Sequence, residues 1–284
     1  MSERLADIQS RSEAARQFSM VAAALRAAAG ARASEARVHL EPLRTYSDIV
    51  ARSLAMALRI QGRQDLAMHA QTQDRILIVL GAEQGFAGGY GTRVLHAAKP
   101  LLAQAKTQVI MAGLRSCMAA RESGWPLAGD MPMPVRADDV ASAADRLLNL
   151  LEQTMLTWPD AEIYLFHMRP ASSAPAETSL RRLLPLDLSA LDLRIDAHPP
   201  IMANAPHDMI PALIQDYVFA LLCDALNAAL VAENEARMRA MTETQKHVGD
   251  LLEELTTKAR RIRQDEITND VIDLAARLPD SRMT

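Results

Sequence analysis

Aromatic residues are scarce in this chain, since Phe, Trp and Tyr make up only 4% of its 284 residues. Most globular cores use aromatic rings as large space-fillers. A core without them must rely on aliphatic side chains and alanine, which suits helices packed closely side by side. The 49% hydrophobic content is ordinary and excludes a chain that is disordered throughout. The length allows one large domain or two modest ones.

Other absences exclude whole classes of function. The two cysteines, Cys117 and Cys223, are far apart and fit no metal or redox spacing, so we expect two reduced, buried thiols. No pair among the seven histidines has the spacing of a zinc site. A net charge of -4 gives no basic field for nucleic acid. Neither G-x-S-x-G nor a plausible Cys/His pair occurs, so the sequence predicts no catalytic site, metal or cofactor.

Membrane-spanning segments are also not expected. No uninterrupted apolar run reaches the roughly 18 to 20 residues that a membrane helix needs. The first residues are charged and do not resemble a signal peptide. A role at a membrane must therefore come through partners.

Both ends of the chain predict long helices. Residues 1–60 are rich in alanine, the best helix former, and we expect one long helix disturbed at Gly30 and near Pro42. After Pro206 at its start, the stretch 206–278 contains only Pro211 and Gly249 as breakers and predicts a helix from about 208 to 278. A helix of that length needs a partner helix or another protein along most of it.

The last helix carries a heptad seam. Apolar and small residues recur at alternating gaps of three and four, which predicts a left-handed coiled coil. The seam consists of Met238, Met241, Gln245, Val248, Leu252, Leu255, Ala259 and Ile262. A second stripe with a shifted phase follows at Ile267, Val271, Leu274 and Leu278, so the helix end should face a different neighbour.

The middle of the chain changes period. Apolar strands at 75–81, 109–112 and 161–168 alternate with helical patterns at 92–105 and 137–157, and 169–175 reads as a loop. Such alternation predicts a mostly parallel sheet. The predicted fold is therefore α/β, with terminal helices at 1–60 and 206–278 paired as an antiparallel coiled coil around an inserted α/β domain at 74–200.

Two motifs leave alternatives open. The glycine loop at 81–91, with Gly85, Gly88 and Gly89, follows a strand and opens a helix, where a phosphate loop would lie. Its spacing fits neither nucleotide fingerprint, so a structural turn is the other reading. The basic run at 258–263 is a solvated helix face, a nucleic-acid stripe or a docking site for carboxylates of a partner.

Several segments in order resemble the ATP synthase gamma family. Residues 20–26 resemble M-V-A-A-A-K-L-R without its Lys, 44–46 resemble R-P-Y, and 83–90 resemble R-G-L-C-G-G-F. Near the end, 233–241 resemble S-E-x-A-A-R-M-x-A-M, and 261–271 resemble K-A-R-Q followed by I-T-x-E-L. Phe18 stands where the family has Met, and the stretch between Gly30 and Pro42 is lengthened, which indicates a divergent or alternative subclass.

The resemblance implies a non-catalytic central-stalk rotor with a Rossmann-like middle domain, which couples transmembrane ion flow to ATP synthesis or hydrolysis. Its implied partners are three alpha and three beta subunits, an epsilon subunit and the membrane c-ring, at the cytoplasmic face of a bacterial inner membrane. It implies rotor–stator contacts for six residues: Arg263, Gln264, Thr268, Arg237, Asp270 and Phe18.

Two other classes of protein fit the same patterns. One is an α/β nucleotide-binding enzyme with coiled-coil arms, which would bind ATP or NAD at the glycine loop. The other is a coiled-coil scaffold, whose arms would pair between chains and form a homodimer.

Overall fold

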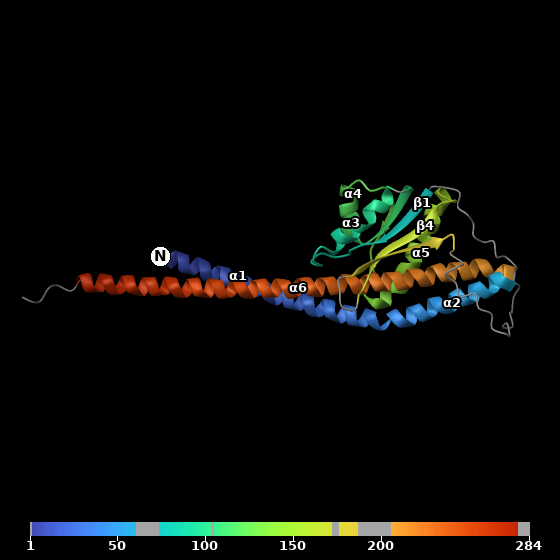
Figure 1. Cartoon of the computed structure of the whole chain (residues 1–284). Helices are drawn as coiled ribbons and strands as arrows, with labels where there is room; N and C mark the ends of the chain where they lie inside the picture. The colour runs from blue at the N-terminus through green and yellow to red at the C-terminus, as the bar shows by residue number, and fades with distance from the viewer. Residues whose placement is uncertain (1, 61–73, 104, 172–175, 187–205, 278–284) are drawn as a thin grey trace, which may run out of the picture. The chain divides into compact units, whose positions relative to one another are not determined.

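The computed structural model describes residues 2–60, 74–103, 105–171, 176–186 and 206–277 (Figure 1). It divides into two compact units. The terminal unit combines Met1–Ala27 with Arg239–Thr284, and the central unit is Ala28–Met238. The two chain ends therefore share one unit. Since both long helices contribute to both units, the predicted boundaries at 60, 74, 200 and 206 stay a prediction.

The first helical region is two helices, α1 (Ser2–Val38) and α2 (Leu40–Ile60). The break at His39 has a local cause: Pro42 has no N–H to donate to the Val38 carbonyl. The predicted disturbance near Pro42 is confirmed. The predicted disturbance at Gly30 is wrong, because α1 continues through Gly30. One glycine costs a helix only about 1 kcal/mol, and a Cβ there would lie 3.5 Å from Met238 Sδ, in the packed interface.

The last helix, α6 (Pro206–Arg277), has 72 residues and agrees with the predicted helix within two residues at each end. By length and composition it could cross a membrane, but half of its most apolar window is buried inside the chain. Leu222, Leu226 and Val231 of this helix are at most 1% exposed and belong to the core of the central unit. The apolar character of this part of α6 thus serves internal packing.

The helices α1 and α6 are antiparallel, as the pairs of neighbouring residues show. Within the central unit, Asn227 Nδ2 donates to Ala36 O, and Gly30 faces Met238. Within the terminal unit, the Lys258 ammonium, and more weakly the Arg11 guanidinium, lower the pKa of Glu254. Residues earlier in α1 therefore neighbour residues later in α6. The predicted antiparallel coiled coil is confirmed.

Small side chains form the α1 side of this interface. Buried alanines recur every seven residues along α1, and each is 8% exposed or less: Ala15, Ala22, Ala29 and Ala36. On α6, Met241, Val248 and Leu255 are buried with the same spacing. The other predicted seam residues of α6 are partly buried, so the heptad seam is confirmed. Alanine brings the two helix backbones close together.

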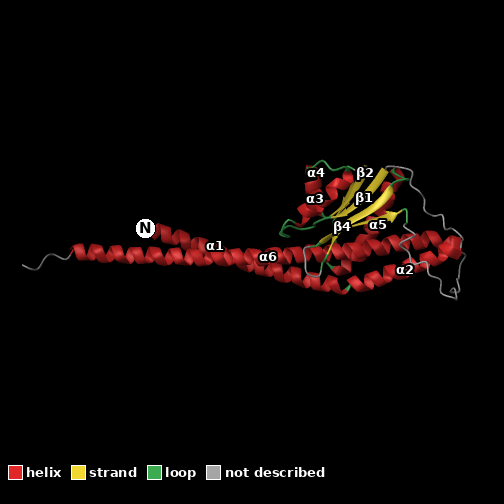
Figure 2. Ribbon diagram, viewed as in Figure 1, coloured by secondary structure: helices red, strands yellow, loops and turns green. Residues whose placement is uncertain are grey.

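A five-stranded sheet occupies the central unit (Figure 2), and its strands follow one another in the order β3-β2-β1-β4-β5. Its strands are β1 (Asp74–Leu80), β2 (Lys106–Ala112), β3 (Leu127–Met131), β4 (Glu162–Arg169) and β5 (Glu177–Leu184). The first four pair in parallel, and β5 is an antiparallel edge strand. The three predicted strands and the mostly parallel sheet are confirmed, whereas β3 and β5 were not predicted.

Alternate residues of the strands face two different layers of helices. Ile76, Ile78 and Leu80 pack in one cluster with residues of α5 (Val140–Thr157), α2 and α6. Leu77 and Val79 pack in the other, with α3 (Tyr90–Leu102) and α4 (Leu114–Glu122). Strands buried on both faces read as continuous apolar runs. Helix α4 was not predicted, and the helix predicted from 137 begins with a 3-10 turn, η1 (Ala137–Asp139).

Candidate functional site

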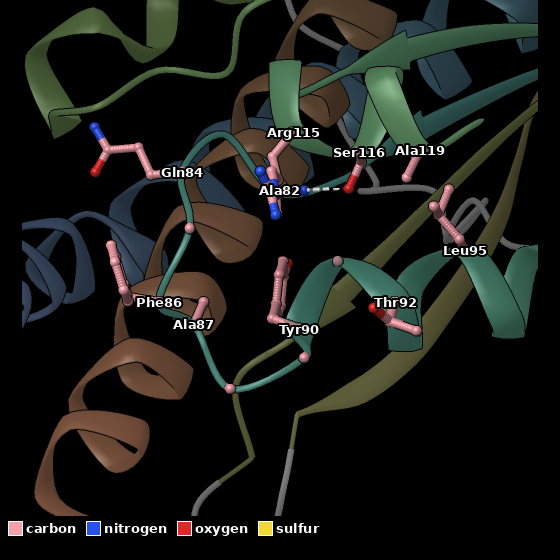
Figure 3. A pocket seen from close by; sticks show the side chains of 14 residues that line it. Ala82, Gln84, Phe86, Ala87, Tyr90, Thr92, Leu95, Arg115, Ser116 and Ala119 are labelled. Atoms are coloured by element: carbon pink, nitrogen blue, oxygen red, sulfur yellow. Dashed lines mark hydrogen bonds between the residues drawn. The ribbon is translucent and has the colours of Figure 1, made fainter. Parts of the chain in front are cut away.

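The glycine loop joins the end of β1 to the start of α3 and borders a cavity of about 330 Å³. Figure 3 shows the loop around this cavity, with Ser116 of α4 on the opposite wall. Gly89 precedes α3 with φ of 71°, in the left-handed region that favours glycine. Phe86 also has a positive φ, and its side chain is 68% exposed. The loop therefore holds an aromatic ring outward at its tip.

Backbone amides of this loop bond inside the chain. Ala82 N donates to Ser116 Oγ at 2.8 Å (Figure 3). Glu83 N and Gln84 N donate to the two carboxylate oxygens of Glu233, each at 3.2 Å. A phosphate-binding loop needs such amides to point at its ligand. Because these three amides already donate to Ser116 and Glu233, the loop is better described as a structural turn than as a nucleotide site.

The Glu233 carboxylate belongs to a buried ion pair on α6. Arg237 Nη2 lies 2.5 Å from Glu233 Oε1, and the two side chains are 6% and 4% exposed. Arg237 also donates to Gly85 O at 3.2 Å and Gln84 O at 3.4 Å. Its fourth partner is Asn234 Oδ1 at 3.0 Å. A buried pair needs such additional hydrogen bonds to offset the loss of hydration.

Two further side chains extend this network. Glu83 Oε2 accepts from Leu114 N at 3.1 Å and from Met133 N at 2.8 Å. Tyr90 is fully buried, and its hydroxyl donates to Ala229 O at 3.4 Å. Burial, and then the negative charge of Glu233, raises the pKa of Tyr90, so its phenol stays protonated. The site thus consists of structural hydrogen bonds around a loop.

Known proteins match this chain over nearly its whole length. A family model described as ATP synthase matches residues 4–276. The ATP synthase gamma chain of Beutenbergia cavernae is 28% identical over 264 residues, which cover 87% of this chain and 88% of the relative. The gamma chain of Frankia casuarinae is 26% identical and covers 95% and 93%. The chain belongs to the ATP synthase gamma family. Like other gamma chains, it is a rotor subunit and not the catalytic subunit.

Solved structures share the fold of this gamma-family chain. A chain of the Euglena gracilis mitochondrial ATP synthase, from the structure of OSCP, F1 and c-ring, has a TM-score of 0.63 and 11% identity. The match covers 100% of this chain and 99% of that one. A chain of the Tetrahymena thermophila central stalk and c-ring has a TM-score of 0.57 and 14% identity, and covers 78% and 98%. At such identities the likeness shows the fold alone.

The predicted contact residues fall in two separate places. Arg263, Gln264, Thr268 and Asp270 are exposed on α6 within the terminal unit, and Phe18 is 50% exposed on α1. Phe18 and Arg263 therefore come from two different helices, α1 and α6. Arg237 is buried in the central unit and bonded internally. Of the six, Gln264 and Thr268 are in contact, since Thr268 Oγ1 donates to Gln264 O at 2.8 Å.

Sequence reasoning assigned no role to Glu83 or Glu233, although both lie in motifs that carried the resemblance. The only available signal was the spacing of Glu233 and Arg237, four residues apart on a helix, which allows an ion pair. A surface pair has the same spacing, so the sequence could not show burial. The bonds to residues 83–85 join segments about 150 residues apart, which a local pattern does not predict.

Other ionisable groups in the described residues form no candidate centre. No cluster of three or more His, Cys, Asp and Glu side chains that could hold a metal occurs among them. Both cysteines are free and buried, as predicted. Burial raises the pKa of Cys117, and raises the pKa of Cys223 to about 12, so neither is a reactive thiolate.

Proposed function

We propose that the terminal unit of this chain turns within a ring of three alpha and three beta subunits. In that position it would couple transmembrane ion flow to ATP synthesis or hydrolysis in the ring. The single observation that carries the proposal is the match of the gamma family to nearly the whole chain, residues 4–276. It includes both helices of the terminal unit and the central sheet.

The uncovered apolar side chains of the terminal unit support a surrounding partner. Beyond Leu255, no described side chain of α6 is buried. Large apolar side chains there are 58–67% exposed: Ile267, Val271, Ile272 and Leu274. On α1, Phe18, Met20 and Val21 are 50–64% exposed. Exposed apolar patches of this kind mark interaction sites. Apolar contacts have no fixed direction, so a shaft can turn against them.

Polar side chains on the same part of α6 would couple the rotor angle to the ring. Arg263 and Gln264 are exposed, and we place them against an acidic loop of one beta subunit at a time. Thr268 and Asp270 follow one to two turns later. A guanidinium fork can bind a carboxylate in two places. Preference for one of three equivalent subunits would bias their conformations through differential affinity.

The remaining partners belong to the same proposal. The central unit would bind the epsilon subunit and rest on the membrane c-ring, with the glycine loop at Gly85, Gly88 and Gly89 near these contacts. The chain belongs to the membrane-peripheral F1 part of the enzyme. We place it at the cytoplasmic face of a bacterial inner membrane, without a membrane span of its own.

The double variant Arg263→Ala/Gln264→Ala tests the polar coupling contact. We expect normal assembly with alpha and beta subunits, but ATP hydrolysis and ion pumping reduced by about tenfold or more, because one charged contact of this kind is worth about 1.5–3 kcal/mol. Lys258→Ala is the matched control, since this exposed lysine lies five residues away and about 140° around the helix. ATP hydrolysis and ion pumping at wild-type rates in the double variant would contradict the proposed role of Arg263 and Gln264.

A further inference from the structure

The buried pair Glu233–Arg237 uses its hydrogen-bonding capacity on one short stretch of loop. The carboxylate accepts from Glu83 N and Gln84 N, and the guanidinium donates to Gln84 O and Gly85 O. Four hydrogen bonds therefore join one helical turn of α6 to three consecutive residues. We call this set of bonds the clip.

The side chain of Glu83 connects the clip to the rest of the sheet. Its Oε2 atom accepts from Leu114 N, the first residue of α4, and from Met133 N, two residues after β3. The backbone of Glu83 is bonded to Glu233 at the same time. The carboxyl ends of β1, β2 and β3 are thus linked to α6 through two carboxylates.

Among the described residues, the clip gathers more hydrogen bonds between α6 and the α/β part of the central unit than any other place on the helix. Elsewhere α6 packs mainly through aliphatic side chains such as Leu222, Leu226 and Val231, with single hydrogen bonds at Tyr217 and Ala229. Apolar packing is non-directional and resists sliding only through shape. Hydrogen bonds depend steeply on distance and angle, and those to charged groups are the stronger ones. A twist of α6 against the sheet would therefore strain the four bonds of the clip together.

We infer that the clip is the point at which torque passes between α6 and the α/β sheet. Glu233, Arg237 and Glu83 act as positioning residues, since they keep the sheet in a fixed angular relation to the helix. This inference rests on the proposed rotary function. It gives Arg237 an internal role in place of a contact with the stator ring.

Exchanging the two charged residues tests whether the hydrogen bonds to the loop matter, or only the attraction between opposite charges. The variant Glu233→Arg/Arg237→Glu keeps opposite charges four residues apart. However, an arginine at 233 cannot accept from two amides, and a glutamate at 237 cannot donate to two carbonyls. The exposed pair Glu254–Lys258 has the same spacing on the same helix, and its reversal is the matched control.

The measurement is the angular fluctuation of a bead on the central unit while the alpha–beta ring is fixed to a surface. The bead is attached through Ser123→Cys, at an exposed position. We expect the Glu233/Arg237 reversal to widen the angular variance at least about twofold, with ATP hydrolysis retained, and the Glu254/Lys258 reversal to leave it unchanged. Wild-type variance in the Glu233/Arg237 reversal would overturn the inference.

Arg237→Lys keeps the inference testable if the reversal does not assemble. Lysine retains the charge but lacks the fork that reaches both Gln84 O and Gly85 O. We expect an intermediate variance, and an unchanged value would contradict the clip. Hydrogen exchange on the full chain should show about tenfold faster exchange of the amides of Glu83 and Gln84 in this variant. Unchanged exchange would also overturn the clip, because these amides would not depend on the pair.

The two proposals can fail separately. A wild-type complex that hydrolyses ATP without rotating would end the proposed function, and the role in torque with it, while the exchange result would still report the bonds of the clip. Normal rotation with unchanged stiffness in both clip variants would end the further inference alone.

Discussion

The Glu233 carboxylate and the Arg237 guanidinium meet at 2.5 Å, one turn apart on α6, with both side chains almost fully buried. Most ion pairs at this spacing lie on helix surfaces and add only about 0.3–0.5 kcal/mol. This pair instead borders a loop that is distant in sequence. The Glu233–Arg237 pair is therefore buried, although its spacing is that of a surface pair, because the loop at residues 83–85 covers it.

Removing one partner of this pair should strongly destabilise the chain. We expect Arg237→Met to lower the free energy of unfolding by about 3–5 kcal/mol, because it leaves the Glu233 charge buried without its partner. Lys258→Met breaks the exposed pair with Glu254 and should leave the free energy of unfolding almost unchanged. Urea unfolding of the full chain checks both variants. Similar losses in the two variants would show that burial does not distinguish the pairs.

Two glycines near the loop should differ in their tolerance of a side chain. Gly113 has φ of 108°, and a Cβ there would lie 2.8 Å from Ala82 O. We expect Gly113→Ala to cost at least about 2 kcal/mol. Gly85 has open space around an added Cβ, so Gly85→Ala should change stability by less than about 0.5 kcal/mol. Thermal unfolding of both variants provides the comparison, and a tolerated Gly113→Ala would contradict it.

The alanine seam of α1 should not accept larger side chains. Ala22 is 1% exposed, whereas Ala24 two residues later is exposed. Leucine and alanine have similar helix propensities, so Ala22→Leu and Ala24→Leu differ mainly in packing. We expect a loss of about 1–3 kcal/mol for Ala22→Leu and little change for Ala24→Leu. Equal stability of the two variants in urea would argue against close packing at Ala22.

His167 should make the chain less stable in mild acid. It lies within β4, and burial lowers its pKa to about 4, assisted by the charges of Arg169 and Arg181. The unfolded imidazole has a pKa of about 6.5 and binds protons first. Stability should therefore fall as the pH decreases from about 6.5 to 4, by roughly 3 kcal/mol from this group. Urea unfolding of the wild type and His167→Gln should differ in this slope, and parallel pH profiles would contradict the assignment.

Elements with strong local patterns were predictable from the sequence. β1 is a continuous apolar run because both of its faces are buried, and the heptads of α6 mark the one face that packs against α1. β3 contains Gly129 and Asp130, and β5 is mostly exposed, so neither carries a strand pattern. Their positions depend on pairing with β2 and β4. The short helix α4 opens directly after Gly113 without a side-chain cap that would indicate its start.

The candidate site was predictable only in part. The glycine loop and its position after β1 follow from the sequence pattern. The role of Arg237 does not, because its partners Gln84 O and Gly85 O are backbone atoms of the loop about 150 residues earlier. The contacts expected for Arg263, Gln264, Thr268 and Asp270 depend on other chains, so they stay predictions.

Rotation of the assembled complex tests the central claim most directly. The alpha–beta ring, purified with this chain and epsilon in a 3:3:1:1 ratio, would be fixed to a surface with a bead at Ser123→Cys of the chain. On addition of ATP we predict rotation of the bead in one direction, in steps of a third of a turn, because the ring has three equivalent sites. Steady ATP hydrolysis by labelled complexes whose beads do not turn would contradict the account.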